Sequence, residues 1–287
     1  MNRVMRFDIT LLTEVRHPDL TSDDRLLRGA LEARGATVRA AIWNDPAVDW
    51  SASAVTVFRS TWDYFHHIRE FAEWLDVVEL QTRLVNDGKT VRWNMHKGYL
   101  RDLAERGVPI VPTLFVDHGD HFDLSPPQAP GEWSDVVIKP CVSGSSFGAA
   151  RFDLRTATAE AQSHLQSLVA VRDTMVQPYL AAVETERERS LIFFDGSYSH
   201  AIRKTPFTAW SAGATDLRHD ASAEEIAFGR GVLGVLDTMP AYARVDIVPA
   251  DGSPLLMELE VIEPSLFFDA LPGSEDALAE ILLRDVR

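Results

Sequence analysis

The sequence predicts an α/β amino-terminal domain followed by an α+β remainder. Early in the chain, short apolar runs at 7–12, 38–43 and 55–58 alternate with helical or polar stretches, which is typical of parallel βαβ units. Later, Asp195-Gly196 separates two alternating runs, and this dipeptide accepts the positive φ values of a hairpin turn. We therefore expect a Rossmann-like domain over 1–92, a smaller α+β lobe over 93–180 and a carboxy-terminal lobe over 181–287.

Apolar spacing and capping residues mark the individual elements. Thr21 to Asp24 supplies an N-cap and first-turn acids for a helix that runs through Leu31 and ends at Gly35. Gly107 is the expected C-cap of a later helix. Further helices are expected at 71–78, 95–106 and 222–236, and further strands at 84–85, 114–116, 136–138, 149–152, 190–194, 198–203, 242–248 and 255–260.

Composition limits the classes of partner. The 287 residues are 46% hydrophobic and 25% charged, a globular balance. Lys plus Arg number 28 against 43 Asp plus Glu, and the net charge of −15 argues against nucleic acid and anionic membranes as partners. Cys141 is the single cysteine, so no internal disulfide can form, and neither a signal peptide nor an uncharged span of membrane length is visible. We expect a soluble cytoplasmic protein.

Two strand segments carry the most informative pattern, Arg244-Val-Asp246 and Glu258-Leu-Glu260. Because alternate residues of a strand face the same side, Arg244 shares a face with Asp246, and Glu258 shares one with Glu260. If the strands pair, three carboxylates converge, and Mg²⁺ binds such oxygen ligands at about 2.1 Å. The alternative is an exposed acidic strand face, but apolar residues throughout 255–262 favour a buried sheet, where unpaired carboxylates are rare.

These segments, with Pro264 four residues after the second, resemble the magnesium-binding end of ATP-grasp ligases. The resemblance implies that Asp246, Glu258 and Glu260 hold one or two Mg²⁺ ions and that Arg244 contacts the transferring phosphoryl group of ATP. Most members of the family have Asn at the position of Glu260. The acidic residue keeps an oxygen ligand and adds a charge.

Two lysines and a loop of small residues resemble the phosphate-binding groups of the same family. Lys97, in Arg-Trp-Asn-Met-His-Lys, and Lys139, at the end of an apolar strand, each resemble a lysine that contacts ATP phosphates. The loop 143–148 resembles the flexible phosphate loop, with Ser143 and Ser146 as its expected contacts. The alternatives are a solvated surface-helix lysine for Lys97 and an ordinary serine-glycine turn for the loop.

The segment Gln177-Pro-Tyr179-Leu180 resembles the hinge between the two lobes that grip ATP. The resemblance implies that backbone groups of Tyr179 and Leu180 bind adenine and that Gln177 adds a contact. Glu188 stands at the position of the acid that holds the ribose hydroxyl groups, but the alternating acids Glu184, Glu186 and Glu188 leave the register open, so Glu184 is a second candidate.

Lys204, two residues before Pro206, resembles the cation that neutralises the γ-phosphate region as an acyl phosphate forms. The family usually has an arginine in the segment that follows. In this chain 207–214 contains none, and Arg218 is the nearest substitute.

The segment Arg59 to Tyr64 follows a predicted strand, and ligands bind at the carboxyl ends of strands in open α/β sheets. It therefore predicts a substrate site made by Arg59, Ser60, Thr61 and Asp63. The alternative is that its aromatic residues only pack against the core or a lid.

Together these motifs cover nearly the whole chain and resemble the ATP-grasp family of ring-closing enzymes in D-cycloserine biosynthesis and related glutathione-synthetase-like proteins. The resemblance implies a ligase that uses ATP and Mg²⁺ to convert a small amino-acid-like carboxylate or carbamate into an acyl phosphate. The enzyme would then form a C–N bond, as an amide, a peptide or a closed ring, and release ADP and phosphate. Members of the family are commonly homodimers.

Two other classes of function remain open. A non-catalytic ATP-binding sensor or scaffold is favoured by the missing loop arginine, although three converging acids and two lysines are more than such a protein needs. A kinase-like enzyme would release the phosphorylated intermediate itself.

Overall fold

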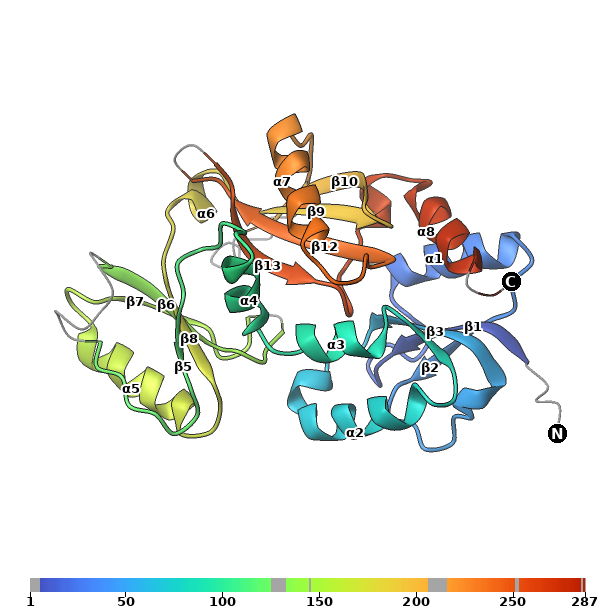
Figure 1. The fold of residues 1–287 in the computed structure, drawn as a ribbon, viewed down its shortest axis with the longest axis horizontal. Helices are drawn as coiled ribbons and strands as arrows, with labels where there is room; N and C mark the ends of the chain where they lie inside the picture. The colour runs from blue at the N-terminus through green and yellow to red at the C-terminus, as the bar shows by residue number, and fades with distance from the viewer. Residues whose placement is uncertain are drawn as a thin grey trace.

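The computed structural model describes residues 6–124, 133–144, 146–205, 216–250, 253–284 and 286. Three separate sheets form three lobes, which meet around a short helical segment near the middle of the molecule (Figure 1). This mixed architecture agrees with the α/β and α+β classes expected from the sequence. In the part of the chain that is described, no helix is both long and apolar enough to cross a membrane.

The amino-terminal domain contains a four-stranded parallel sheet with the order β2-β1-β3-β4. Its helices α1 and α2 lie in the connections between strands, as the βαβ pattern predicted. The elements are β1 (Phe7–Thr13), α1 (Ser22–Ala33), β2 (Val38–Ile42), η1 (Trp50–Ala52), β3 (Ser53–Ser60), η2 (Tyr64–His66), α2 (Ile68–Val78) and β4 (Arg83–Val85).

The prediction of one helix over 95–106 is wrong in part. The structure has two short helices, α3 (Gly88–Asn94) and α4 (Tyr99–Glu105), with Lys97 in the bend between them. The Asp87 side chain caps α3 by accepting a hydrogen bond from the Thr90 N–H. The Asn94 side chain donates to the Leu259 carbonyl at 2.8 Å, which fixes the end of α3 against the carboxy-terminal lobe. Residues 95–98 therefore form the bend between the helices rather than the first turn of the predicted helix, which begins at Tyr99.

The small lobe is an antiparallel sheet with the order β5-β8-β6-β7, covered by α5 (Figure 1). Its core contains Val136, Ile138, Leu165 and Val176, all almost completely buried. The elements are β5 (Leu114–Val116), β6 (Asp135–Pro140), β7 (Ala150–Asp153), α5 (Thr158–Val169) and β8 (Thr174–Pro178).

The carboxy-terminal lobe is a five-stranded sheet with the order β11-β10-β9-β12-β13. Asp195 and Gly196 have φ values of 48° and 72°, so the turn between β9 and β10 has the positive φ angles that the sequence predicted. The connection between the strands expected at 242–248 and 255–260 includes 251–252, which lie outside the described residues. The elements are α6 (Ala182–Thr185), β9 (Arg189–Phe194), β10 (Ser197–Arg203), β11 (Leu217–His219), α7 (Ala223–Gly234), β12 (Tyr242–Val248), β13 (Leu255–Glu260), η4 (Phe268–Ala270) and α8 (Ser274–Arg284).

The end of the chain returns to the amino-terminal domain, where α8 lies beside α1 (Figure 1). Leu278 and Leu282 of α8 share one apolar cluster with Leu27 and Leu31 of α1, and each of these side chains is 0% exposed. The strands β1 and β3 contribute to the same cluster. The amino-terminal domain is therefore completed by α8.

Tyr242 and Asn86 join the amino-terminal domain to the carboxy-terminal lobe. The Tyr242 hydroxyl lies 2.8 Å from the Phe58 carbonyl oxygen, 3.2 Å from that of Val85 and 2.9 Å from that of Ile262. The Asn86 side chain donates to the backbone carbonyls of Tyr242 and Val261. These buried polar contacts hold the two lobes in a fixed relation.

We predict that Tyr242→Phe lowers the free energy of unfolding by about 1–3 kcal/mol, because it leaves buried carbonyl groups without their donor. Urea denaturation followed by circular dichroism would measure the change. Tyr198→Phe serves as the control, because Tyr198 is partly exposed. Equal stability of wild type and Tyr242→Phe would contradict the role assigned to this hydroxyl.

Candidate active site

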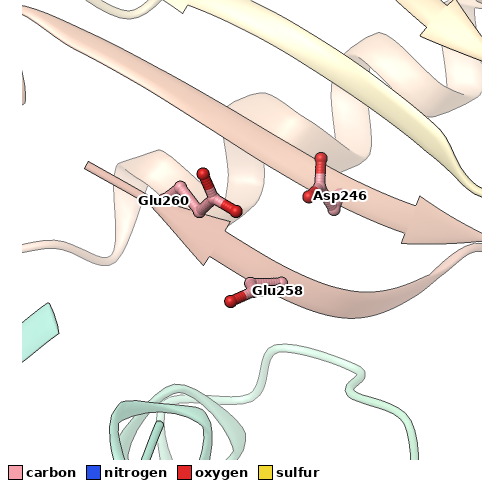
Figure 2. A group of neighbouring side chains, drawn as sticks. All are labelled: Asp246, Glu258 and Glu260. Atoms are coloured by element: carbon pink, nitrogen blue, oxygen red, sulfur yellow. The ribbon is translucent and has the colours of Figure 1, made fainter. Parts of the chain in front are cut away.

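Three carboxylates converge where β12 and β13 pair. Asp246 is opposite Glu258 and Arg244 is opposite Glu260 in the antiparallel register. One oxygen atom from each of Asp246, Glu258 and Glu260 lies within 4.8 Å of the others (Figure 2). The pairing of these strands, and the convergence expected from it, are confirmed. The alternative of an exposed acidic face concerned Glu258 and Glu260, whose side chains are only 24% and 25% exposed and therefore partly buried.

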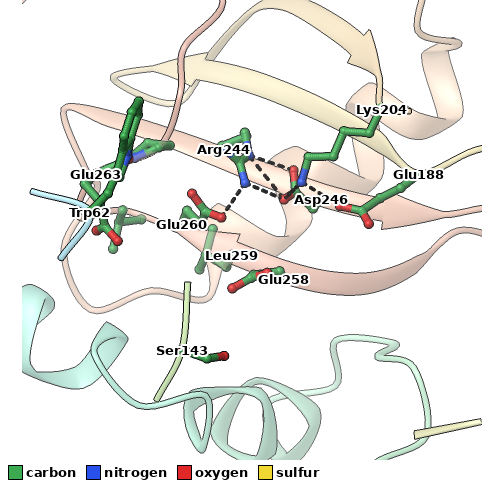
Figure 3. Close-up of polar contacts among 12 residues, drawn as sticks. Trp62, Ser143, Glu188, Lys204, Arg244, Asp246, Glu258, Leu259, Glu260 and Glu263 are labelled. Carbon is green, nitrogen blue, oxygen red and sulfur yellow. Dashed lines mark hydrogen bonds and ion pairs between the residues drawn. The ribbon is translucent and has the colours of Figure 1, made fainter. Parts of the chain in front are cut away.

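Basic side chains neutralise these acids (Figure 3). Arg244 Nη2 lies 2.9 Å from Asp246 Oδ2, and the same guanidinium also pairs with Glu260. Lys204 Nζ bridges Asp246 Oδ2 at 2.6 Å and Glu188 Oε1 at 2.7 Å. The predicted catalytic residues Arg244 and Lys204 are therefore in direct contact with one of the predicted metal ligands.

The protonation of the cluster follows from this pairing. Burial opposes the charge of Asp246, but Arg244 and Lys204 outweigh it and lower the pKa of Asp246 well below its usual range. Burial raises the pKa of Glu260 to about 7, although Arg244 acts in the opposite direction. Burial also raises the pKa of Glu188 despite the contact with Lys204. Asp246 is thus the carboxylate that stays most firmly ionised.

Glu258 and Glu260 line a cavity of 470 Å³ at the junction of the three lobes, whereas Asp246 is fully buried behind its wall. Both hydrophobic and charged side chains line it, and all three lobes contribute. Among the residues predicted from the sequence, the lining contains Lys97, Lys139, Ser143, Ser146, Gln177, Tyr179, Leu180, Glu188, Lys204, Arg244, Glu258 and Glu260.

Lys97 is buried, so the alternative of a solvated surface lysine is wrong. Its ammonium group lies 3.0 Å from Glu258 Oε1 and donates to the Ser143 carbonyl at 2.8 Å. Lys139 lies on β6 and also faces the cavity. Burial lowers the pKa of Lys139. No ion pair to Lys139 is found among the described residues, so this ammonium group remains available to an anion.

The loop 143–148 approaches the amino-terminal domain closely. A Cβ atom at Gly144 would lie 2.8 Å from Phe65 Cε1, so glycine is needed for this contact. The rings of Phe65 and Phe147 are 5.6 Å apart. Ser146 has φ of 59°, and Ser145 lies outside the described residues. The loop is therefore held between the small lobe and η2.

The hinge segment presents fewer free groups than expected. The Tyr179 N–H donates to the Asp135 carbonyl at 2.7 Å, so it is already used within the small lobe. Gln177 donates through its side chain to Thr113 Oγ1 at 2.9 Å. Glu184 accepts a hydrogen bond from the Tyr179 hydroxyl and is not among the residues lining the cavity, whereas Glu188 is. This geometry favours Glu188 over Glu184 as a cavity acid.

The four predicted substrate residues are all absent from the cavity wall. Arg59 is 1% exposed; it pairs with Asp24 at 2.8 Å and donates to the Pro264 carbonyl at 2.9 Å. Ser60 and Thr61 are fully buried, and Asp63 accepts a hydrogen bond from the Trp43 indole. Their contact with a substrate stays a prediction.

Arg218, the expected substitute for a missing loop arginine, does not line the cavity either, and its side chain is 57% exposed. The segment 207–214 falls outside the described residues.

Several residues of the cavity wall were not assigned to the site from the sequence, and three of them are aromatic or acidic. Trp62 and Tyr64 lie on the wall, although the alternative for the aromatic residues of this segment was packing against the core or a lid. Glu263 also lines the cavity, and burial together with the charge of Glu260 raises the pKa of Glu263 to about 8. An acid directly before a proline, just after the metal-binding strand, was the signal that could have identified it.

Comparisons with known proteins agree with this geometry. Residues 9–86 match the family model of the D-cycloserine synthetase DcsG N-terminal domain. The cycloserine biosynthesis protein DcsG of Streptomyces lavendulae is 33% identical over 279 residues, which cover 90% of this chain and 92% of that protein. The crystal structure of D-cycloserine synthetase DcsG superposes with a TM-score of 0.87 at 31% identity, over 97% of this chain and 99% of that one.

More distant structures share the fold. D-alanine–D-alanine ligase from Bacillus anthracis has a TM-score of 0.61 at 13% identity, covering 98% of this chain and 96% of that one. The ATP-grasp ligase PsnB, solved with a precursor peptide and AMPPNP, has a TM-score of 0.64 at 15% identity, covering 100% of this chain and 99% of that one. With the identity to DcsG over nine-tenths of the chain, these relationships show that the protein belongs to the DcsG family of ATP-grasp ligases.

Proposed function

We propose that this protein is an ATP- and Mg²⁺-dependent ligase that activates a small amino-acid-like carboxylate or carbamate as an acyl phosphate and then forms a C–N bond. The observation that carries the proposal is the convergence of Asp246, Glu258 and Glu260 at the wall of one cavity between lobes, where Arg244 and Lys204 contact Asp246. A cavity that combines a cation-binding face with several ammonium groups suits a metal-bound polyphosphate.

The donor set fits magnesium. All three groups offer carboxylate oxygens, the ligands that Mg²⁺ prefers, and they are close enough to share one or two ions. When bound, Mg²⁺ would neutralise charge on the β- and γ-phosphates. Holding the metal requires Glu260 to be ionised, and Arg244 beside it favours that form.

The nucleotide would extend from the hinge to these acids. With the Tyr179 N–H already used, adenine recognition falls to the Leu180 N–H and the Tyr179 carbonyl, while Glu188 is placed for the ribose hydroxyl groups. Lys97, Lys139 and the loop containing Ser143 and Ser146 would surround the phosphates.

In the first chemical step, a substrate oxygen attacks the γ-phosphorus, the bond to the β,γ-bridging oxygen breaks and ADP leaves. Lys204 and Arg244 would stabilise the charge that spreads over the equatorial oxygens. In the second step, an amine nitrogen attacks the acyl carbon, loses a proton and displaces phosphate. The chain needs no protein nucleophile for either step.

The nitrogen nucleophile decides whether the product is linear or cyclic. Intramolecular attack would close a ring, and the relationship to a cycloserine biosynthesis protein supports that outcome. Attack by a second molecule would give an amide or a peptide. A homodimer is part of the same proposal.

A second candidate is a non-catalytic ATP-binding sensor or scaffold. It is favoured by the absence of arginine from 207–214, where ATP-grasp ligases usually have one. The ionised, buried Asp246 and its two basic partners favour the enzyme, because a protein without turnover gains nothing from this buried charge.

We predict that Glu258→Gln lowers acid-stimulated ADP release by a factor on the order of 10²–10³, because it removes one metal ligand and the counter-ion of Lys97. ADP and phosphate would be measured with ATP, Mg²⁺ and a panel of amino acids, O-ureido acids and aminooxy acids.

The matched control is Glu105→Gln, the same change at an exposed residue for which the described residues give no ion pair. It should retain wild-type rates. If the protein binds ATP tightly in the presence of Mg²⁺ but no acid stimulates ADP release, the result would contradict the ligase and favour the sensor or scaffold.

We also predict that Mg²⁺ and AMPPNP together raise the melting temperature more than the sum of the two alone. Without nucleotide the acids are already paired with Arg244, Lys204 and Lys97, so the metal alone gains little. At 100 times its Kd a ligand adds about 2.7 kcal/mol of stability.

Differential scanning fluorimetry, with EDTA as the reference, would measure these shifts. Asp246→Asn should lose the Mg²⁺-dependent part and keep the part due to nucleotide. A wild-type shift with AMPPNP that is the same in EDTA and in Mg²⁺ would rule out a metal at these acids.

A further inference from the structure

Glu263 is a cavity acid that the proposed mechanism does not use. It follows β13 by three residues and is half-buried on the cavity wall. Its backbone carbonyl accepts a hydrogen bond from the Trp62 indole at 3.0 Å, so a residue of the amino-terminal domain fixes its position. Figure 3 shows Arg244 and Glu260 between Glu263 and the Lys204–Glu188 pair. Glu263 therefore lies at the end of the cavity away from Lys204.

The other acids of the catalytic cluster each have a cation. Lys204 pairs with Glu188 and Asp246, Arg244 pairs with Glu260, and Lys97 pairs with Glu258. Among the described residues, no basic side chain forms an ion pair with Glu263. A half-buried carboxylate without a counter-ion is unfavourable, and burial accordingly raises the pKa of Glu263 to about 8.

Tyr64 lies on the same part of the wall and also has an unused polar group. Its side chain is 6% exposed and lines the cavity, and no hydrogen bond to its hydroxyl is found among the described residues. Burial and the negative charge of Glu263 raise the pKa of Tyr64, so its hydroxyl stays neutral. With Trp62, this end of the cavity offers two aromatic rings, a hydroxyl and a carboxylate.

That combination suits a positively charged nitrogen. A carboxylate repels phosphate and carboxylate groups, so the nucleotide and the reacting acid group belong near the cations on the other side. An ammonium group gains from ion pairing with Glu263, from hydrogen bonding to the Tyr64 hydroxyl and from the aromatic faces beside it.

We propose that Glu263, Tyr64 and Trp62 form the subsite for a protonated amine of the acid substrate, which makes the enzyme selective for amino acids over amine-free acids. This inference rests on the proposed ligase function and specifies its substrate class. Glu263 supplies the counter-ion, Tyr64 a hydrogen-bond acceptor and Trp62 the contact that positions Glu263.

The test compares acids in matched pairs that differ only in the amine: alanine with propionate, serine with 3-hydroxypropionate, and O-ureidoserine with 3-(ureidooxy)propionate, each chiral acid as both enantiomers. The readout is the ratio of kcat/KM values for ADP release within a pair. Wild type should prefer the amine-bearing acid by a factor on the order of 10–100. Glu263→Gln should bring this ratio close to one by raising KM for the amino acid, with KM for ATP unchanged.

Two further variants make the result specific. Glu263→Asp retains the charge and should keep part of the preference, whereas Glu105→Gln should keep all of it. Melting temperatures measured with AMPPNP and Mg²⁺ would show that each variant is folded and binds nucleotide.

The outcomes separate the inference from the function on which it rests. An active Glu263→Gln enzyme that keeps the wild-type preference would overturn the subsite and leave the ligase intact. A wild-type enzyme that uses both members of a pair equally would do the same. Failure of every acid to stimulate wild-type ADP release would overturn the ligase function and the subsite together.

Discussion

Charge balance in the cavity is the constraint on which the rest of the site depends. Asp246 has no exposure to water, and it stays ionised because Arg244 and Lys204 both contact it. Arg244 comes from the same strand, whereas Lys204 follows β10, which lies two strands away in the sheet. Lys97 reaches Glu258 from the bend between α3 and α4. Lys97 also donates to the Ser143 carbonyl, so a group that would handle the phosphates connects the carboxy-terminal lobe with the small lobe.

The sequence was most informative where a local pattern determines geometry. The two-residue repeat of Arg244, Asp246, Glu258 and Glu260 was enough to predict a shared face, because strand periodicity depends only on neighbouring residues. The structure pairs those strands in the register that brings the acids together. Asp195-Gly196 was equally reliable, because few dipeptides tolerate two positive φ angles. The division of the chain at 92 and 180 stays a prediction.

Long-range contacts explain the features of the site that the sequence did not predict. Arg59 lies near the carboxyl end of β3, as a ligand-binding residue would, but α1 supplies Asp24 as its buried partner. Lys97 was expected on a helix, but it lies in the bend before α4, close to Asn94, whose side chain bonds to β13. The position of Glu263 is fixed by a hydrogen bond from Trp62, about two hundred residues earlier in the chain. Each outcome depends on a partner that no local pattern identifies.

The position of α8 has a consequence for synthesis of the protein. The amino-terminal sheet is complete once β4 has been made, yet Leu278 and Leu282 of α8 cover part of its core. That apolar surface must remain open while nearly two hundred further residues leave the ribosome. The nascent chain therefore carries an uncovered apolar face throughout that interval, and the first domain reaches its final packing only once α8 has been made.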